Sequence, residues 1–252
     1  MTVPSVLAVE HLSLQIGGAR IIDDVSLQVP EGEMLGVIGP NGAGKTTLFN
    51  LVSGVMRPTA GRVTLDGEDV TTRSVDARAR AGLGRSFQTS NLFAGLSALE
   101  NVRLAAQAAL GGSLSPFRTP RVADRASTIA AERLDDVGLG HLAATAAGGL
   151  SHGDKRKLEI AMLLAADPRV ILLDEPMAGV GSGDVPGLVE LIRRVHREQG
   201  RTVLMVEHHM EVVLGLVDRV AVMHHGSLLA CDTPEAVMAD PVVQSAYLGE
   251  PV

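Results

Sequence analysis

The sequence predicts an α/β protein with a central parallel sheet, an antiparallel β part at the N-terminus and an inserted α-helical part. Three observations carry this prediction. Unbroken apolar runs at 35–38, 170–173 and 203–206 are typical of parallel strands buried on both faces. The opening stretch, up to about residue 30, instead alternates apolar and polar residues, as antiparallel strands do. Between 96 and 147 the apolar spacing is helical.

The elements follow from turn and cap signals. We expect strands, in order, at 6–16, 21–29, 33–39, 61–67, 169–176 and 201–209, and a hairpin over 218–230. We expect helices at 45–54, 96–110, 121–139, 151–164 and 185–199, with short helices over 234–249. The whole chain, 1–252, then forms one domain. Its core comprises roughly 1–90 and 165–252, and its helical subdomain comprises roughly 91–164.

Composition limits the function. Hydrophobic residues make up 46% of the chain and aromatic residues only 2%, so aliphatic side chains fill the core and few rings are available to stack on nucleobases. The net charge of −7 argues against nucleic acid as a partner. The single cysteine, Cys231, allows no intrachain disulfide. No secretory signal or apolar run of membrane-spanning length is present, so another chain would hold the protein at any membrane.

The stretch GPNGAGKTT fits the phosphate-loop pattern G-x-x-x-x-G-K-[ST] in full, between a strand and a helix. Its backbone N–H groups would surround phosphate oxygens, helped by the positive end of the helix. Lys45 would reach the β- and γ-phosphates, and the Thr46 hydroxyl would bind Mg²⁺. The predicted nucleotide-binding residues here are Gly39, Pro40, Asn41, Gly42, Ala43, Gly44, Lys45, Thr46 and Thr47.

Polar residues also follow the other two buried strands. Asp174 would hold Mg²⁺ through water, and Glu175 would orient or deprotonate the attacking water. The alternative is a pair of acids that caps the next helix. His208 is a candidate contact to the γ-phosphate, or else a solvated histidine. Gln88 taken alone is most simply a surface residue.

The stretch GGLSHGDKRKLEIAMLL has two interpretations. Ser151 followed by Asp154 is a capping box, with which any helix could begin. A helix N-terminus with Ser151 and the exposed backbone of Gly153 is also an anion site. Because the chain already has a complete phosphate loop, a second anion site is useful only if it closes over a nucleotide bound elsewhere.

Taken in order, the segments GPNGAGKTT, FQ, LSHGD, ILLDEP and EH resemble the nucleotide-binding subunit of ABC transporters over nearly the whole chain. The resemblance implies a P-loop NTPase core, ATP and Mg²⁺ as cofactors, and two subunits that pack head to tail. It places Ser151 and Gly153 against the partner subunit's ATP. It makes Gln88 a catalytic residue near Mg²⁺ and the transmembrane partner, His208 the switch histidine and Glu175 the catalytic base.

Finer features resemble one subgroup. The segments NLFAGLSALENV, LSHGDKRKLEIA, VEHHMEVV and AYLGE are similar to importer ATPases for branched-chain amino acids, urea or short amides. The resemblance implies transmembrane permeases, an identical or similar second ATPase subunit, and a periplasmic or surface substrate-binding protein. It also implies a place at the cytoplasmic face of the membrane. The ATPase of lipopolysaccharide export shares several of these segments and is an alternative.

The sequence departs from the family pattern at a few positions. Ile16 stands where an aromatic residue usually stacks on adenine, so only an aliphatic contact would remain. His152 and Asp154 replace the commoner Gly and Gln of the signature segment. Gly181 stands where Asn or Asp is expected, which removes a usual contact across the dimer. None of these changes removes the catalytic residues, so we expect hydrolysis to survive.

Non-transport ABC ATPases are the second class of function. DNA-repair members carry a long coiled coil between the phosphate loop and the signature segment, and this chain has no sustained heptads there. Translation members fuse two ATPase halves in one chain, whereas this chain has one. An iron–sulfur assembly ATPase is harder to exclude, because it is also a single half. A third class, a binding module without hydrolysis, conflicts with the intact Glu175 and His208.

Overall fold

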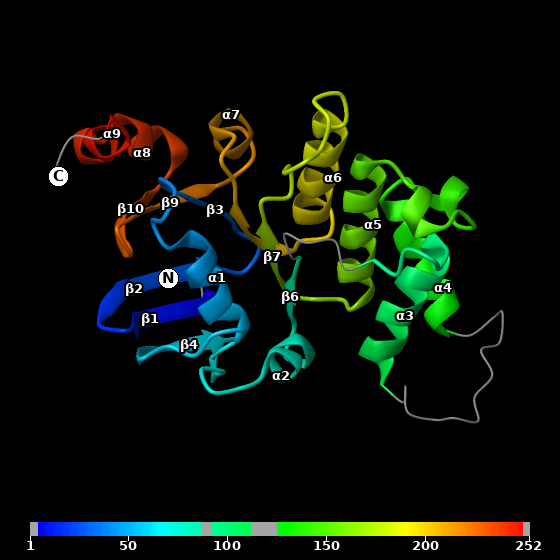
Figure 1. Cartoon of the computed structure of the whole chain (residues 1–252), viewed down its shortest axis with the longest axis horizontal. Coiled ribbons are helices and arrows are strands. Elements are labelled where there is room, and N and C mark those ends of the chain that lie inside the picture. The colour runs from blue at the N-terminus through cyan, green and yellow to red at the C-terminus, as the bar shows by residue number, and fades with distance from the viewer. Residues whose placement is uncertain (1–4, 87–91, 112–124, 249–252) are drawn as a thin grey trace. The chain divides into compact units, whose positions relative to one another are not determined.

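The computed structural model describes residues 5–86, 92–111 and 125–248. The chain divides into two compact units (Figure 1). The first comprises Met1–Arg85, Arg169–Pro176 and Arg193–Val252, and the second comprises Ser86–Pro168 and Met177–Ile192.

The N-terminal part of the first unit is an antiparallel sheet. Its strands are β1 (Ser5–Ile16), β2 (Ala19–Pro30), β4 (Ala60–Leu65) and β5 (Glu68–Asp69), in the order β2-β1-β4-β5. The turn between β1 and β2 is at Gly17 and Gly18, both of which have positive φ angles that glycine adopts without strain. The predicted antiparallel β part is therefore confirmed.

The second sheet is mostly parallel. Its strands are β3 (Met34–Ile38), β6 (Leu83–Arg85), β7 (Val170–Asp174), β8 (Thr202–Val206), β9 (Arg219–His224) and β10 (Ser227–Asp232), in the order β10-β9-β3-β8-β7-β6. Among the described strands of this sheet, only the β9–β10 pair is antiparallel, and β9 itself runs parallel to β3. Every residue of β3, β7 and β8 is buried, as the unbroken apolar runs predicted.

The first unit also holds short helices. They are α1 (Lys45–Ser53), α2 (Val75–Arg80), α7 (Met210–Leu214), α8 (Pro234–Ala239) and α9 (Pro241–Leu248). The residues of α1 share one apolar core with both sheets, including Leu48 and Phe49 of the helix and Leu172 of β7. The helix that follows the phosphate loop is therefore anchored between the two sheets (Figure 1).

The second unit is helical in the part that the structure describes. It holds α3 (Ala98–Leu110), α4 (Arg125–Asp136), α5 (His152–Ala165) and the short 3₁₀ helices Gly140–Leu142 and Ala147–Gly149. Helix α6 (Val185–Arg197) begins in this unit and ends in the first. Helices α3, α4 and α5 pack against one another. No helix among the described residues is long and apolar enough to cross a membrane.

Besides the two 3₁₀ helices, the described elements that were not predicted are β5, α2, β6 and α7. Each spans six residues or fewer, which is too short for a periodic pattern to emerge. Helix α2 begins with Ser74, whose side chain accepts a hydrogen bond from the backbone N–H of Ala77. Strand β6 becomes a strand only because it pairs with β7 at the sheet edge.

Candidate nucleotide-binding site

The carboxyl ends of β3, β7 and β8 meet at one edge of the parallel sheet. Val206 of β8 pairs with Asp174 of β7 on one side and with Val37 of β3 on the other. The segments after these strands therefore leave the sheet at the same edge. Ligands of open parallel sheets bind at this edge. Asp174 ends β7, and the phosphate loop, Glu175 and His208 follow these strands, so all of them lie at this edge.

The phosphate loop joins β3 to α1. Gly39, Gly42 and Gly44 have φ angles of 149°, 81° and 100°, in the region that favours glycine. A Cβ atom at Gly39 would lie 2.1 Å from the backbone oxygen of Met223. Gly44 is the N-cap of α1, and no side chain caps this helix end. The first N–H groups of α1 are therefore left for an anion, as the loop pattern predicts.

Lys45 folds back over its own loop. Its Nζ donates hydrogen bonds to the backbone oxygens of Gly39, at 2.6 Å, and Pro40, at 2.9 Å. Burial lowers the pKa of the Lys45 ammonium below its ordinary value, and the Glu175 carboxylate partly opposes this shift. A positive group thus lies inside the loop, where it can meet a phosphate.

Glu175 and His208 contact each other. Their Oε1 and Nε2 atoms are 2.7 Å apart, although 33 positions separate the residues in the chain. Glu175 has a φ of 49°, and its backbone N–H donates to the oxygen of Val206. A non-glycine residue in this conformation is uncommon and is found at functional sites. The strained backbone aims the carboxylate at the histidine.

Asp174 is almost fully buried and is held by a residue that the sequence analysis missed. The guanidinium of Arg85 donates to Asp174 Oδ2 at 2.9 Å. The Asp174 carboxylate and the Thr46 hydroxyl, in the first turn of α1, are the oxygen donors that Mg²⁺ prefers. Because Mg²⁺ is usually bound through one or two protein oxygens together with waters and phosphates, these two residues fit it.

Glu207 is a second residue that sequence reasoning missed. Its side chain is buried, and Oε2 accepts a hydrogen bond from the backbone N–H of His208. The same oxygen lies 3.0 Å from Nδ1 of His209. Glu207 therefore fixes the turn that presents His208. The sequence shows that Glu207 is followed by two histidines, but it does not show which of their groups the carboxylate contacts.

Ser151 and Gly153 belong to the second unit. Ser151 is the N-cap of α5, and its Oγ accepts from the backbone N–H of Asp154 at 3.1 Å. Oγ also contacts the Asp154 carboxylate at 2.8 Å. A Cβ atom at Gly153 would lie 2.8 Å from Oδ2 of Asp184. The predicted helix cap is present, and only glycine fits at position 153 without a shift of Asp184.

Two further predicted residues complete the account. Ile16 ends β1 beside the Gly17 turn, and 52% of its surface is exposed, so it is accessible for an aliphatic contact. Gln88 lies outside the described residues.

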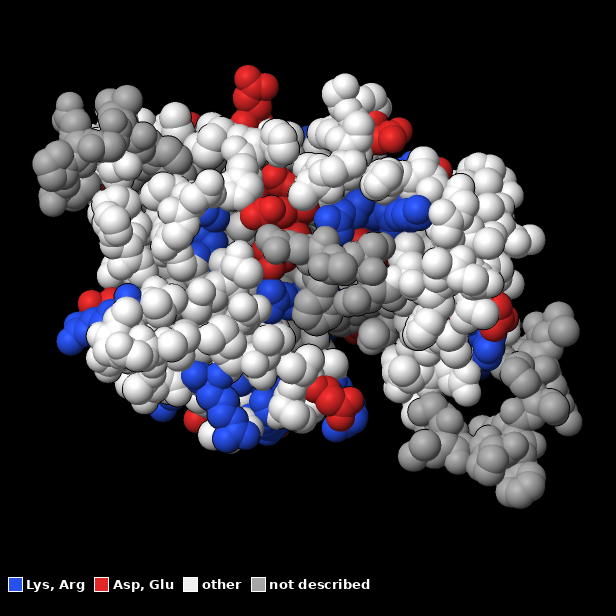
Figure 2. All heavy atoms as spheres, in the orientation of Figure 1, with Lys and Arg blue, Asp and Glu red and all other residues white. Residues whose placement is uncertain are grey.

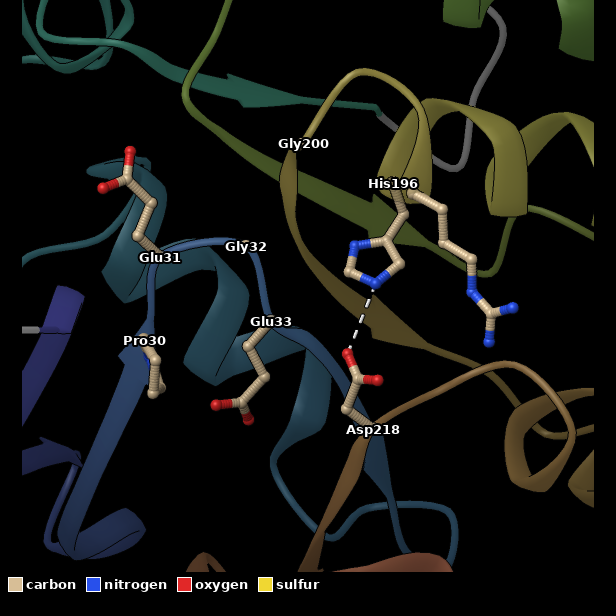
Figure 3. A pocket seen from close by; sticks show the side chains of 8 residues that line it. Pro30, Glu31, Gly32, Glu33, His196, Gly200 and Asp218 are labelled. Carbon is tan, nitrogen blue, oxygen red and sulfur yellow. Dashed lines mark ion pairs between the residues drawn. The ribbon is translucent and has the colours of Figure 1, made fainter. Parts of the chain in front are cut away.

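The opposite edge of the parallel sheet has a pocket of different character. Glu33, Gly200 and Asp218, which lie just before β3, β8 and β9, help to line it (Figure 3). The Nε2 atom of His196 is 3.3 Å from Oδ2 of Asp218, which also accepts from the backbone N–H of Met34. These contacts join the amino ends of the strands.

On the face drawn in Figure 2, Lys and Arg side chains lie among Asp and Glu side chains.

Comparisons with known proteins show the family to which the chain belongs. The model of the family described as "ABC transporter" matches residues 22–178, more than half of the chain. The model described as "Branched-chain amino acid ATP-binding cassette transporter" matches residues 227–252. The high-affinity branched-chain amino acid transport ATP-binding protein BraF of Pseudomonas aeruginosa is 38% identical over 97% of this chain and 98% of its own length. The lipopolysaccharide export system ATP-binding protein LptB of Haemophilus influenzae is 36% identical, with 98% of each chain covered.

Solved structures give the same answer. The ADP conformation of an ATP-binding cassette of an ABC transporter superimposes with a TM-score of 0.86 at 29% identity, and the match covers 98% of this chain and 100% of that one. A dimeric cassette in a post-hydrolysis state, bound to ADP and Pi, matches with a TM-score of 0.75 at 26% identity, over 90% and 98% of the two chains. Motifs, fold and relatives coincide. The chain belongs to the ABC transporter family, as an ATP-binding subunit that hydrolyses ATP.

Proposed function

We propose that this subunit powers the import of branched-chain amino acids through separate transmembrane permeases. The observation that carries the ATPase half of the proposal is the Glu175–His208 contact at the sheet edge that also carries the phosphate loop. The importer half is supported by the C-terminal family match over 227–252 and by the name of the relative BraF.

In the proposed mechanism, the phosphate loop and Lys45 bind the β- and γ-phosphates. Glu175 accepts a proton from the attacking water, and His208 holds the carboxylate and contacts the γ-phosphate. A Mg²⁺ ion bound with the nucleotide would neutralise charge on the phosphates, with Thr46, Asp174 and Gln88 as its nearby protein groups. Catalysis then rests on positioning and on charge stabilisation, because the protein forms no covalent bond to phosphate.

The proposed active form is a head-to-tail dimer with two ATP molecules. The start of α5, with Ser151 and Gly153, would offer an anion site, and it belongs to the second unit whereas the phosphate loop belongs to the first. In the dimer it would contact the γ-phosphate bound by the partner subunit. The dimeric cassette with ADP and Pi supports this arrangement. Closing on ATP and reopening after hydrolysis would move the permeases between inward-facing and outward-facing states.

The substitution Glu175→Gln tests this mechanism. It keeps the shape of the side chain but weakens the base, so the variant should bind ATP, hydrolyse it slowly and accumulate as a dimer. Light scattering with ATP should report twice the mass of the nucleotide-free protein. The matched control is Glu68→Gln, an exposed residue of β5. An E175Q protein that stays monomeric with ATP would contradict the composite site.

Lipopolysaccharide export is the second candidate, because the relative LptB is almost as similar to this chain as BraF. Purification of the native complex separates the two. The protein would be isolated from its own membranes in mild detergent with Mg·ATP, and its partners identified by mass spectrometry. If the system is an importer, amino-acid permeases and a second ATPase subunit should co-purify, and the system should include a substrate-binding protein. The subunit would then lie at the cytoplasmic face of the membrane. Soluble partners alone would favour iron–sulfur assembly.

A further inference from the structure

Arg85 is a buried charged residue at the edge of the ATP site to which no role has been assigned. It is the last residue of β6, which pairs in parallel with β7, the strand that ends at Asp174. The exposed fractions of the Arg85 and Asp174 side chains are 7% and 1%. Their 2.9 Å contact is therefore a buried ion pair between two adjacent strands.

The same guanidinium also binds α1. Its Nη1 donates to Oδ1 of Asn50 at 2.8 Å and to Oγ of Ser53 at 2.7 Å, whereas Nη2 donates to Asp174. Its central carbon lies 6.0 Å from the centroid of the Phe49 ring. Arg85 thus connects the helix that begins with Lys45 to the strand that ends with Asp174.

This arrangement requires arginine. A guanidinium has five N–H donors in a rigid planar fork, so it can bind the helix and the carboxylate at once, whereas a lysine ammonium is a point charge. Removal of one partner of a buried ion pair is strongly destabilising, because it leaves the other charge uncompensated. Because Arg85 binds both Asp174 and α1, it fixes the position of the Asp174 carboxylate relative to the start of α1.

Arg78 provides an internal comparison. It is more deeply buried and also holds α1, because its Nη1 donates to the backbone oxygens of Leu51 and Val52 at the end of the helix. Its Nη2 donates to the oxygen of Thr71. Arg78 therefore anchors α1 without an ion pair to Asp174, and the two arginines separate support of the helix from support of the carboxylate.

We infer that Arg85 is a positioning residue of the ATP site, which sets the affinity for Mg²⁺ by fixing the Asp174 carboxylate to α1. The inference rests on the proposed role of Asp174 toward Mg²⁺. Partners that hold a metal-binding carboxylate by hydrogen bonds commonly change metal affinity by about 10- to 100-fold when they are removed. Nucleotide binding without metal would depend on the phosphate loop, whereas the contacts of Arg85 given above are to Asn50, Ser53 and Asp174.

The test measures binding of a fluorescent ATP analogue to the full chain, first in EDTA and then with rising Mg²⁺. Arg85→Met should leave the affinity in EDTA unchanged and raise the Mg²⁺ concentration at the midpoint about tenfold or more. Arg85→Lys should give a smaller shift, since it keeps the charge and loses the fork. Arg78→Met, the matched control, should leave the Mg²⁺ midpoint unchanged. If Arg85→Met does not fold, Arg85→Lys and Ser53→Ala carry the test through their smaller shifts.

The outcomes are distinct. Equal shifts in Arg85→Met and Arg78→Met would overturn the inference and leave Arg85 as a support of α1. An unchanged Mg²⁺ midpoint in Arg85→Met would also overturn the inference. A lower Mg²⁺ midpoint would overturn it as well, because it would mean that Arg85 competes with the metal. Asp174→Asn in the same series tests the proposed role itself. A shift in Asp174→Asn without one in Arg85→Met overturns the inference alone, whereas no shift in Asp174→Asn overturns the role of Asp174 as well.

Discussion

At the scale of single residues, one buried charged side chain lies at each of two opposite edges of the parallel sheet. Lys45 lies in the phosphate loop at the carboxyl edge, and Glu33 lies at the amino edge, where it lines the pocket of Figure 3. Burial shifts the pKa of each group toward its neutral form. A bound phosphate would compensate for the burial of Lys45, whereas among the described residues Glu33 forms an ion pair with Arg219. The two residues should therefore respond differently to substitution.

Lys45→Met should separate stability from function. Because burial lowers the pKa of Lys45, the charged amine costs stability at neutral pH, and its removal should raise the free energy of unfolding of the nucleotide-free protein. ATP affinity should fall about tenfold or more, as expected for the loss of a charge-assisted hydrogen bond to phosphate. Urea unfolding and nucleotide titration measure the two effects. A variant that is less stable and binds ATP normally would contradict the assignment of Lys45.

Glu33→Gln should give a pH-dependent gain in stability. Burial is the main cause of the raised pKa of Glu33, and the ion pair with Arg219 partly offsets it. A raised pKa means that the folded state favours the protonated acid, so this contribution is complete below 4.5, the ordinary value, and is lost as the pH rises through the folded pKa. Urea unfolding of both proteins at several pH values should show that the difference shifts in favour of E33Q as the pH rises. A constant difference would contradict this prediction.

At the scale of elements, the phosphate loop requires glycine for two reasons, positive φ angles and close packing against β9. Helix α1 is uncapped at its start, and the loop before it contains three glycines with positive φ. They differ in their surroundings, because a Cβ atom at Gly39 would meet the oxygen of Met223 whereas one at Gly42 would meet nothing within 4 Å. The same substitution at these two sites separates conformational strain from a steric clash.

Gly42→Ala should cost about 1–2 kcal/mol of unfolding free energy, the cost of placing a side chain in a left-handed conformation. Gly39→Ala should cost more than that, because β9 must also move to relieve a 2.1 Å contact with a backbone atom. Urea unfolding of the nucleotide-free proteins measures both, with Gly42→Ala as the control for strain. Equal losses would mean that the loop relaxes away from β9 at little cost.

At the scale of the whole molecule, the residues of the proposed chemistry are divided between two units. The phosphate loop, Asp174, Glu175 and His208 belong to the first unit, and the start of α5 belongs to the second. If the second unit acts on the nucleotide of a partner subunit, its residues should affect turnover more than nucleotide affinity. Ser151 is suited to this test because another serine, Ser97, caps α3 in the same unit in the same way.

Ser151→Ala and Ser97→Ala should each lower stability by about 1 kcal/mol, since each removes a serine N-cap. Only Ser151→Ala should lower the rate of ATP hydrolysis, and it should change ATP affinity less than turnover. Steady-state hydrolysis, nucleotide titration and thermal unfolding measure the three effects. Equal losses of turnover in the two variants would reduce Ser151 to a helix cap.

The sequence by itself determined the longer elements and predicted the candidate site residues. Buried strands, the phosphate loop and the α5 cap are local patterns, in which neighbouring residues suffice to specify conformation. The acid after β7 and the histidine after β8 were identified in the same way. Short elements such as α2 and α7 were not predicted, because they contain too few residues to show a periodic pattern of apolar residues.

Only the tertiary structure decided which of these residues touch. Glu175 meets His208, and Asp174 meets Arg85 across 89 positions of the chain, because the sheet places β8 and the short β6 on either side of β7. Strand order depends on the packing of the whole core, and no local period encodes it. Arg85 therefore looks like an ordinary charged residue in the sequence, and its place beside the ATP site is a consequence of the fold.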